Sequence, residues 1–154
     1  MPATNVVGTT TVAAAPAVVF AILADPRQHA RIDGSGTVRG VVSGPDRLEL
    51  GSTFGMSMRI KAPYRIRNTV VEHEPDRLIA WRHIGTHRWR YELEPTEDGG
   101  TRVTETWDVS QCGAATRWVL GVLGYPRIHA RSIEQTLANL KAAAEADSPV
   151  SPSS

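Results

Sequence analysis

The chain has 154 residues, of which 41% are hydrophobic and 21% are charged, and this length predicts one domain with a sizeable buried core. The composition excludes a collagen, a wholly disordered chain and a polytopic membrane protein. The 17 Lys and Arg side chains nearly balance the 16 Asp and Glu side chains, for a net charge of +1, so we expect no broad basic face and no nucleic-acid partner.

The start of the chain predicts a strand followed by two short helices. Residues 5–13 are rich in Val and Thr, which is typical of a strand. Pro16 suits the first position of a helix, and apolar residues at helical spacing follow it. Residues 27–32 predict one or two further helical turns before the Asp-Gly-Ser-Gly turn at 33–36. The apolar run at 12–24 is too short to span a bilayer, which takes about 20 residues.

Six further strands are predicted by apolar and polar residues that alternate with a period of two. They cover residues 37–42, 52–59, 65–71, 79–83, 88–94 and 102–109. The alternation breaks at Val70 and Val71, which predicts a β-bulge. Seven strands joined by short turns, each with one polar face, predict a strongly curved antiparallel sheet whose apolar face is covered.

The C-terminal segment predicts the helix that covers the sheet. Between about 116 and 146, apolar residues fall on one helical face: Val119, Leu123, Ile133, Leu137, Leu140 and Ala144. Tyr125 and Pro126 predict a kink or a helix-turn-helix within this segment. We therefore expect residues 1–146 to form a single domain and the Ser- and Pro-rich residues 147–154 to form a disordered tail.

The order of one strand, two short helices, six strands and a long helix resembles the START-like, or helix-grip (SRPBCC), superfamily, in its polyketide cyclase/dehydrase and lipid-transport-like branch. The resemblance covers residues 5–146, and it is carried by AAAPAVVFAILADPRQHARIDGSG, EHEPDRLIAW, GGTRVTETWDVS and SIEQTLANLKAAAE. It implies an α+β helix-grip fold, in which a curved seven-stranded antiparallel sheet wraps around a long C-terminal helix and leaves a cavity between them. Such proteins usually carry a Trp after the first helix, where this chain has His29.

Strand alternation names the side chains on the covered face, and many of them are aromatic or Met. They are Phe54, Met56, Met58, Asn68, Trp81, Trp89 and Trp107. Tyr125 and His129 join them from the covered side of the last helix. Aromatic rings and Met side chains suit an apolar or ring-containing ligand, so we predict that these residues bind one. A well-packed core without a cavity is the alternative interpretation.

Glu105 is an acidic residue that the alternation places on the covered face. Burying an unpaired carboxylate is costly, so this group should be solvated in a cavity, be paired, or have a raised pKa. A raised pKa suits a general base for aldol-type cyclisation or a donor to a ligand carbonyl. His83 and Tyr91 are the accompanying candidate catalytic residues. The structural alternative is a salt bridge from Glu105 to Arg127 or Arg131.

Other kinds of site find little support in the sequence. His83 and His87 flank one turn but lack a third ligand at zinc-site spacing, so we expect no metal. Neither the P-loop lysine nor the GxGxxG spacing is present, so we expect no cofactor. Cys112 is the single cysteine and cannot form an internal disulfide, which favours a reducing, cytoplasmic location.

These observations predict a small-molecule binding protein, a carrier or a sensor, that holds a hydrophobic ligand of lipid or polyketide type between the sheet and the last helix. A polyketide cyclase or dehydrase that uses acid-base groups in the same cavity is the second hypothesis. An interaction domain whose core is filled by its own side chains is the third. The sequence predicts no stable membrane insertion and leaves the oligomeric state open.

Overall fold

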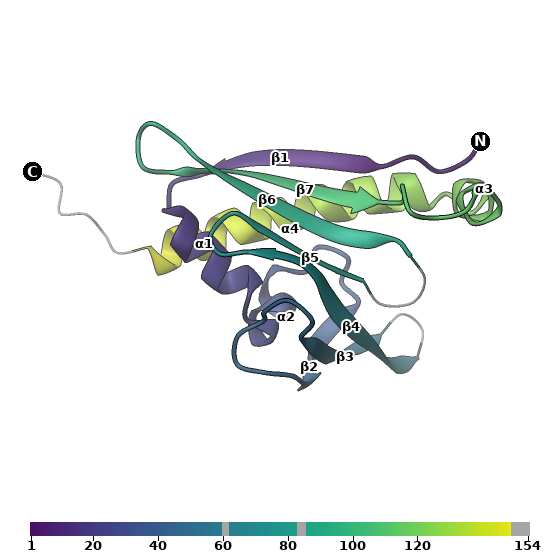
Figure 1. Ribbon diagram of the computed structural model, residues 1–154, viewed down its shortest axis with the longest axis horizontal. Coiled ribbons are helices and arrows are strands. Elements are labelled where there is room, and N and C mark those ends of the chain that lie inside the picture. Colours follow the sequence, from purple (N-terminus) through teal and green to yellow (C-terminus); the bar gives the residue numbers. More distant parts are fainter. Residues whose placement is uncertain (60–61, 83–85, 149–154) are drawn as a thin grey trace, which may run out of the picture.

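A seven-stranded antiparallel sheet lies along a long helix in the computed structural model, which describes residues 1–59, 62–82 and 86–148 (Figure 1). The strands are β1 (Val6–Val12), β2 (Val38–Ser43), β3 (Thr53–Arg59), β4 (Pro63–Glu74), β5 (Leu78–Arg82), β6 (Arg88–Pro95) and β7 (Thr101–Asp108). Their order is β1-β7-β6-β5-β4-β3-β2, so the first strand of the chain pairs with the last. The predicted α+β helix-grip fold is confirmed.

Short helical elements connect β1 to β2, as the sequence predicts. Helix α1 (Pro16–Leu23) begins at Pro16 and buries one apolar side, because its apolar residues recur at helical spacing. A short 3-10 turn, η1 (Pro26–Gln28), follows, and the side chain of Asp25 caps it by accepting a hydrogen bond from the backbone N–H of Arg27 at 3.0 Å. Helix α2 (His29–Ile32) completes the connection.

The inner face of the sheet follows the alternation predicted from the sequence. In β3, the side chains of Phe54, Met56 and Met58 are buried between more exposed neighbours. The same pattern in β7 buries Glu105 with its apolar neighbours. The pairing of β4 with β5 shifts register between Val70 and Glu72, which confirms the predicted bulge.

The C-terminal segment forms two helices with a turn between them. Helix α3 (Ala114–Val122) ends before Gly124, whose φ of 78° lies in the left-handed region that favours glycine. Helix α4 (Tyr125–Asp147) then packs on β1, α1 and α2. It extends one residue past the expected end, where Asp147 pairs with Arg31 at 2.9 Å. Residues 149–154 of the predicted tail lie outside the described residues.

One part of the predicted helix face is wrong. The sequence places Val119 and Leu123 on the covered face, but their side chains are 57% and 60% exposed. The turn at Gly124 changes the direction of the chain, so the periodicity of α4 does not extend into α3, which buries none of its residues. No helix in the described part of the chain has the length and apolar character needed to cross a bilayer.

Candidate functional site

A hollow of about 1620 Å³ lies between the inner face of the sheet and the N-terminal part of α4. It is larger than the roughly 300 to 1,000 Å³ of a pocket for a drug-sized ligand. The residues predicted to bind a ligand all line it: Phe54, Met56, Met58, Asn68, Trp81, Trp89, Trp107, Tyr125 and His129. Of the candidate catalytic residues, Glu105 and Tyr91 line the hollow, and His83 lies outside the described residues.

Four rings form a first group in the lining, which we call the Trp81 cluster: His29, Phe54, Trp81 and Tyr91. Trp81 is stacked between His29 and Tyr91, with ring centroids 4.7 Å and 5.4 Å away. The Phe54 ring lies in a T-shaped arrangement with His29 and with Trp81, with ring centroids 5.3 Å and 5.9 Å apart. Burial lowers the pKa of His29, and its Nε2 lies 2.9 Å from the carbonyl oxygen of Leu23. Nε2 therefore carries the proton of a neutral imidazole, because a carbonyl only accepts.

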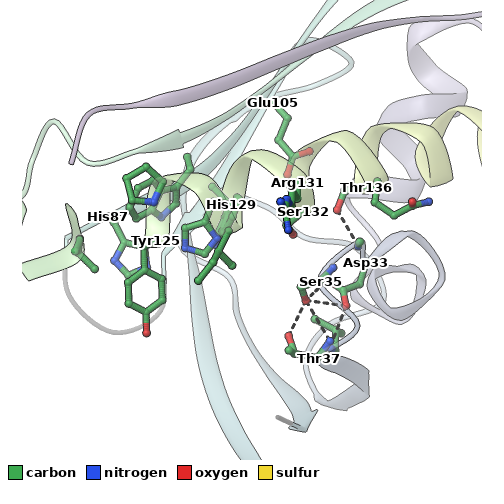
Figure 2. A pocket seen from close by; sticks show the side chains of 18 of the residues that line it. Asp33, Ser35, Thr37, His87, Glu105, Tyr125, His129, Arg131, Ser132 and Thr136 are labelled. Atoms are coloured by element: carbon green, nitrogen blue, oxygen red, sulfur yellow. Dashed lines mark hydrogen bonds between the residues drawn. The ribbon is translucent and has the colours of Figure 1, made fainter. Parts of the chain in front are cut away.

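A second group of rings, the His129 cluster, joins α4 to the sheet and comprises Trp89, Trp107, Tyr125 and His129. The His129 ring centroid lies 4.5 Å from that of Trp107, 4.9 Å from that of Trp89 and 5.5 Å from that of Tyr125. Figure 2 shows Tyr125 and His129 projecting from α4 near His87. Burial lowers the pKa of His87, so its ring is also neutral at pH 7.

Glu105 and Tyr91 form a buried hydrogen-bonded pair on adjacent strands. The Tyr91 hydroxyl donates to Glu105 Oε1 at 2.8 Å, while Oε2 is buried without a hydrogen-bond partner. Burial raises the pKa of the Glu105 carboxyl to about 8, the hydrogen bond from Tyr91 opposes this rise, and the charge of Asp33 adds to it. Burial and the neighbouring Glu105 also raise the pKa of Tyr91 well above its usual value. At pH 7 the carboxyl is therefore mostly neutral and able to donate.

The salt bridge suggested for Glu105 is absent from the described part of the chain. Arg127 and Arg131 are exposed on α4, and the described contacts of Glu105 include Tyr91 but no cation. The sequence placed Glu105 correctly on the inner face but could not identify its partner. A further polar atom on the same strand, the indole N–H of Trp107, is also buried without a hydrogen-bond partner. Unpaired buried polar atoms in a hollow are available to a ligand.

A polar loop between α2 and β2 forms one border of the hollow beside α4. The Ser35 hydroxyl donates to the Asp33 carboxylate at 2.7 Å, and the backbone N–H of Val38 donates to the other Asp33 oxygen at 3.1 Å. The N–H of Gly34 donates to the Thr136 hydroxyl of α4 at 2.8 Å. Figure 2 shows the hydrogen bonds within this loop and the one that joins it to Thr136 of α4. The first set fixes the shape of the loop, and the bond to Thr136 attaches it to the helix.

Sequence reasoning missed several residues of this site. His29 appeared only as a departure from the family pattern, although it is buried at the centre of the Trp81 cluster. Ser132 and Thr136 line the hollow together with His129. They follow His129 by three and seven residues, which is the spacing of residues on one side of a helix, so the sequence contains a signal that predicts them. Among the described residues, no group of three or more His, Cys, Asp or Glu side chains is placed to hold a metal ion.

The sequence is similar to known proteins over nearly all of its length. The family model described as polyketide cyclase/dehydrase and lipid transport matches residues 3–145. The uncharacterized protein Rv0088 of Mycobacterium tuberculosis is 44% identical over 132 residues, which cover 84% of this chain and 59% of that protein. The chain therefore spans about three fifths of the length of the curated relatives it matches.

Solved structures share the fold at low sequence identity. Protein NE0264 from Nitrosomonas europaea superposes with a TM-score of 0.68 and 15% identity, over 94% of this chain and 96% of that one. The AHSA1-like protein from Aeromonas hydrophila gives a TM-score of 0.62 and 18% identity, over 93% of each chain. At such identities the likeness shows the fold alone.

Proposed function

Because the chain belongs to the polyketide cyclase/dehydrase and lipid transport family, we propose that it binds an apolar, ring-containing small molecule in the hollow between the sheet and α4. Residues 1–146 form the binding domain in this proposal, and its location is the cytoplasm. The observation that carries the proposal is the presence of two ring clusters, around Trp81 and His129, in the lining of one hollow of about 1620 Å³.

The lining suits a flat ligand with a polar group. Aromatic rings stack on or meet the edges of other rings, and each such contact adds to the free energy gained from burying apolar area. With a pKa of about 8, roughly nine tenths of the Glu105 carboxyl is neutral at pH 7. In that form its Oε2 can donate to a ligand carbonyl or hydroxyl oxygen, and the Trp107 indole N–H offers a second donor.

Two measurements test the binding function. Native mass spectrometry of the purified protein should reveal a co-purified small molecule, and anilinonaphthalene sulfonate should bind with a change in Trp fluorescence. Trp89→Leu, in the lining, should weaken that binding by about tenfold. Trp118→Leu is the matched control, because Trp118 is exposed and lies outside the hollow. This substitution should leave the binding of anilinonaphthalene sulfonate unchanged. Failure of both polycyclic aromatic compounds and fatty acids to bind would contradict the proposal.

An enzymatic function in the same hollow is the second candidate, favoured by the raised pKa of Glu105 and the unpaired Oε2. Ionised Glu105 would remove a proton from the carbon between two carbonyl groups, and the enolate formed would attack a third carbonyl farther along the same substrate. The protonated carboxyl would then return the proton to the new alkoxide, which completes an aldol cyclisation. Tyr91 would position the carboxyl through its hydrogen bond.

Glu105→Gln separates the two functions, because glutamine keeps a donor and an acceptor but cannot exchange the proton. If the protein only binds, affinity for the ligand should change less than about tenfold and no turnover should be found with a linear poly-β-ketone. If it catalyses cyclisation, the rate should fall by about 10² to 10⁴ with little loss of binding. Glu97→Gln, on an exposed turn, is the control for both assays.

A further inference from the structure

Helix α3 and the start of α4 expose an apolar surface, which we call the α3 face. It consists of Trp118, Val119, Val122, Leu123 and Ile128, each between 53% and 73% exposed. Trp118, Val119 and Val122 of α3 share one arc with Leu123, the C-cap residue, because helical neighbours on one side are spaced by one, three, four or five positions. A helix of a folded domain normally turns such an arc toward the core, yet α3 buries none of its residues.

The opposite side of α3 explains this orientation. Nε of Arg117 donates to the carbonyl oxygen of Ala3 at 2.9 Å, and the N–H of Ala3 donates to the carbonyl oxygen of Arg117 at 2.7 Å. The N-terminal segment also approaches Gly121 so closely that a Cβ there would collide with the carbonyl oxygen of Met1. These contacts hold one side of α3 against the chain and leave the apolar side outward, at the end of the molecule where the N-terminus lies (Figure 1).

The charge of the segment that carries the α3 face is entirely positive. No acidic residue occurs in the 25 positions between Asp108 and Glu134, which include Arg117, Arg127 and Arg131. The rest of the chain has more acidic than basic side chains. Arg127 and Arg131 are exposed and line the hollow together with Leu123 and Ile128 of the α3 face, so this region attracts anions.

We propose that the α3 face docks on the surface of an anionic lipid bilayer. The apolar side chains enter the boundary between headgroups and acyl chains, where the ring of Trp118 is well suited because it combines an apolar body with one N–H group. Arg127 and Arg131 meet the lipid phosphates. A second copy of the chain fits less well, because a symmetric interface would bring the same arginines together without an acidic partner from this segment.

The α3 face is continuous with the hollow. Leu123 and Ile128 belong to both surfaces, since they also line the hollow. An apolar ligand could therefore pass between the bilayer and the hollow with little exposure to water. Docking itself is independent of the proposed ligand, and its test requires none.

Co-sedimentation of the full chain with lipid vesicles tests the docking surface. We expect binding to phosphatidylcholine vesicles that contain phosphatidylserine, weaker binding at high salt, and weaker binding without phosphatidylserine. Trp118→Ser combined with Val122→Ser should lower the partition coefficient about tenfold or more. Arg127→Gln combined with Arg131→Gln should lower it about fivefold for each charge. The Trp fluorescence of the unmodified protein should shift to the blue on binding, and the shift should be smaller in the variant that lacks Trp118, because the other three Trp residues lie outside the α3 face.

The matched controls use exposed side chains of the same kinds at other places in the fold. Leu50→Ser, in the loop between β2 and β3, removes a leucine that is 65% exposed, and Arg39→Gln combined with Arg47→Gln removes two exposed charges. Neither change should affect vesicle binding. The proposal would be overturned if the protein bound neither kind of vesicle. It would also be overturned if the control variants lost as much vesicle binding as the variants of the α3 face and of Arg127 and Arg131. A dimer that Trp118→Ser and Val122→Ser dissociate without changing vesicle binding would assign the face to a second copy and would also overturn it.

Discussion

Glu105 gives the stability of the protein a specific pH dependence. Its pKa is about 8 in the folded protein against an ordinary value of 4.5, so between these values the folded state binds more protons than the unfolded state. The free energy of unfolding should therefore fall as the pH rises through this range, by about 3 to 5 kcal/mol from this group. Glu105→Gln removes the contribution, so the stability of the variant relative to the unmodified protein should increase with pH. Urea unfolding at a series of pH values measures the difference.

Comparing the unmodified protein with the Glu105→Gln variant isolates the effect of the Glu105 carboxyl group on stability. Burial lowers the pKa of His29, so the fold becomes less stable as the pH drops below the ordinary pKa of histidine. Because His29 is present in both proteins, its contribution cancels in the comparison. Glu97→Gln should give a curve parallel to that of the unmodified protein, since its side chain is exposed. Parallel curves for Glu105→Gln as well would show that the Glu105 carboxyl ionises normally.

The position of Glu105 could be predicted from the sequence, but its environment could not. The period of two along β7 is enough to place its side chain with those of Val103 and Trp107 on the inner face. The partner depends on which residue of β6 lies opposite, and that register pairs Glu105 with Tyr91. Register is set by the turn between the strands and by the packing of the whole sheet, which no local pattern encodes.

At the level of elements, the contact of the loop at 33–37 with α4 depends on the absence of a side chain at Gly34. A Cβ there would collide with the backbone oxygen of Ser132 and the backbone N of Thr136. We expect Gly34→Ala to force the loop away from α4, to break the hydrogen bond from the Gly34 N–H to the Thr136 hydroxyl, and to lower the free energy of unfolding by about 1 to 3 kcal/mol. Urea unfolding of the variant measures this cost.

Gly40→Ala is the matched control for this substitution. Gly40 lies in β2, and a Cβ there would have no heavy atom within 4 Å. The free energy of unfolding of the Gly40→Ala variant should therefore be unchanged or slightly increased. Thr136→Val keeps the volume of the side chain but removes the acceptor, and should cost about 1 kcal/mol. If Gly34→Ala were as stable as Gly40→Ala, the loop would not be held tightly against α4.

Strands and helices differ in how far the sequence predicts them. The strands follow from alternation, and even the bulge is visible where Val70 and Val71 interrupt it. The sequence predicts where the helices lie, but continuing one helical periodicity across Gly124 places Val119 and Leu123 on the covered face of α4, which is wrong. A left-handed residue between two helices changes their relative direction, and the direction follows from backbone geometry rather than from apolar spacing. The exposed Val119 and Leu123 are the result.

In the molecule as a whole, α4 has two halves with different surroundings. Its buried residues all follow Ser132 and pack where the helix meets the strands and the short helices: Ile133, Thr136, Leu137, Leu140, Ala143 and Ala144. The preceding turns, from Tyr125 to Ser132, have no buried residue and border the hollow. The sequence predicts a covering helical segment with a kink or a helix-turn-helix at Tyr125 and Pro126, but not this division within α4, because the size of the hollow depends on the curvature of the entire sheet.

This division predicts a gradient of stability along one helix. Backbone amides at 129–132 should exchange with solvent at least tenfold faster than those at 137–144, since fewer buried contacts oppose local opening. A bound ligand should slow exchange at 129–132 specifically, because that segment borders the hollow. Hydrogen exchange followed by NMR measures both effects. Leu140→Ala should cost about 2 to 5 kcal/mol and Ile128→Ala less than about 0.5 kcal/mol, because only Leu140 is buried. Equal protection along α4, with or without ligand, would mean that the helix opens as one unit and that its first turns do not give access to the hollow.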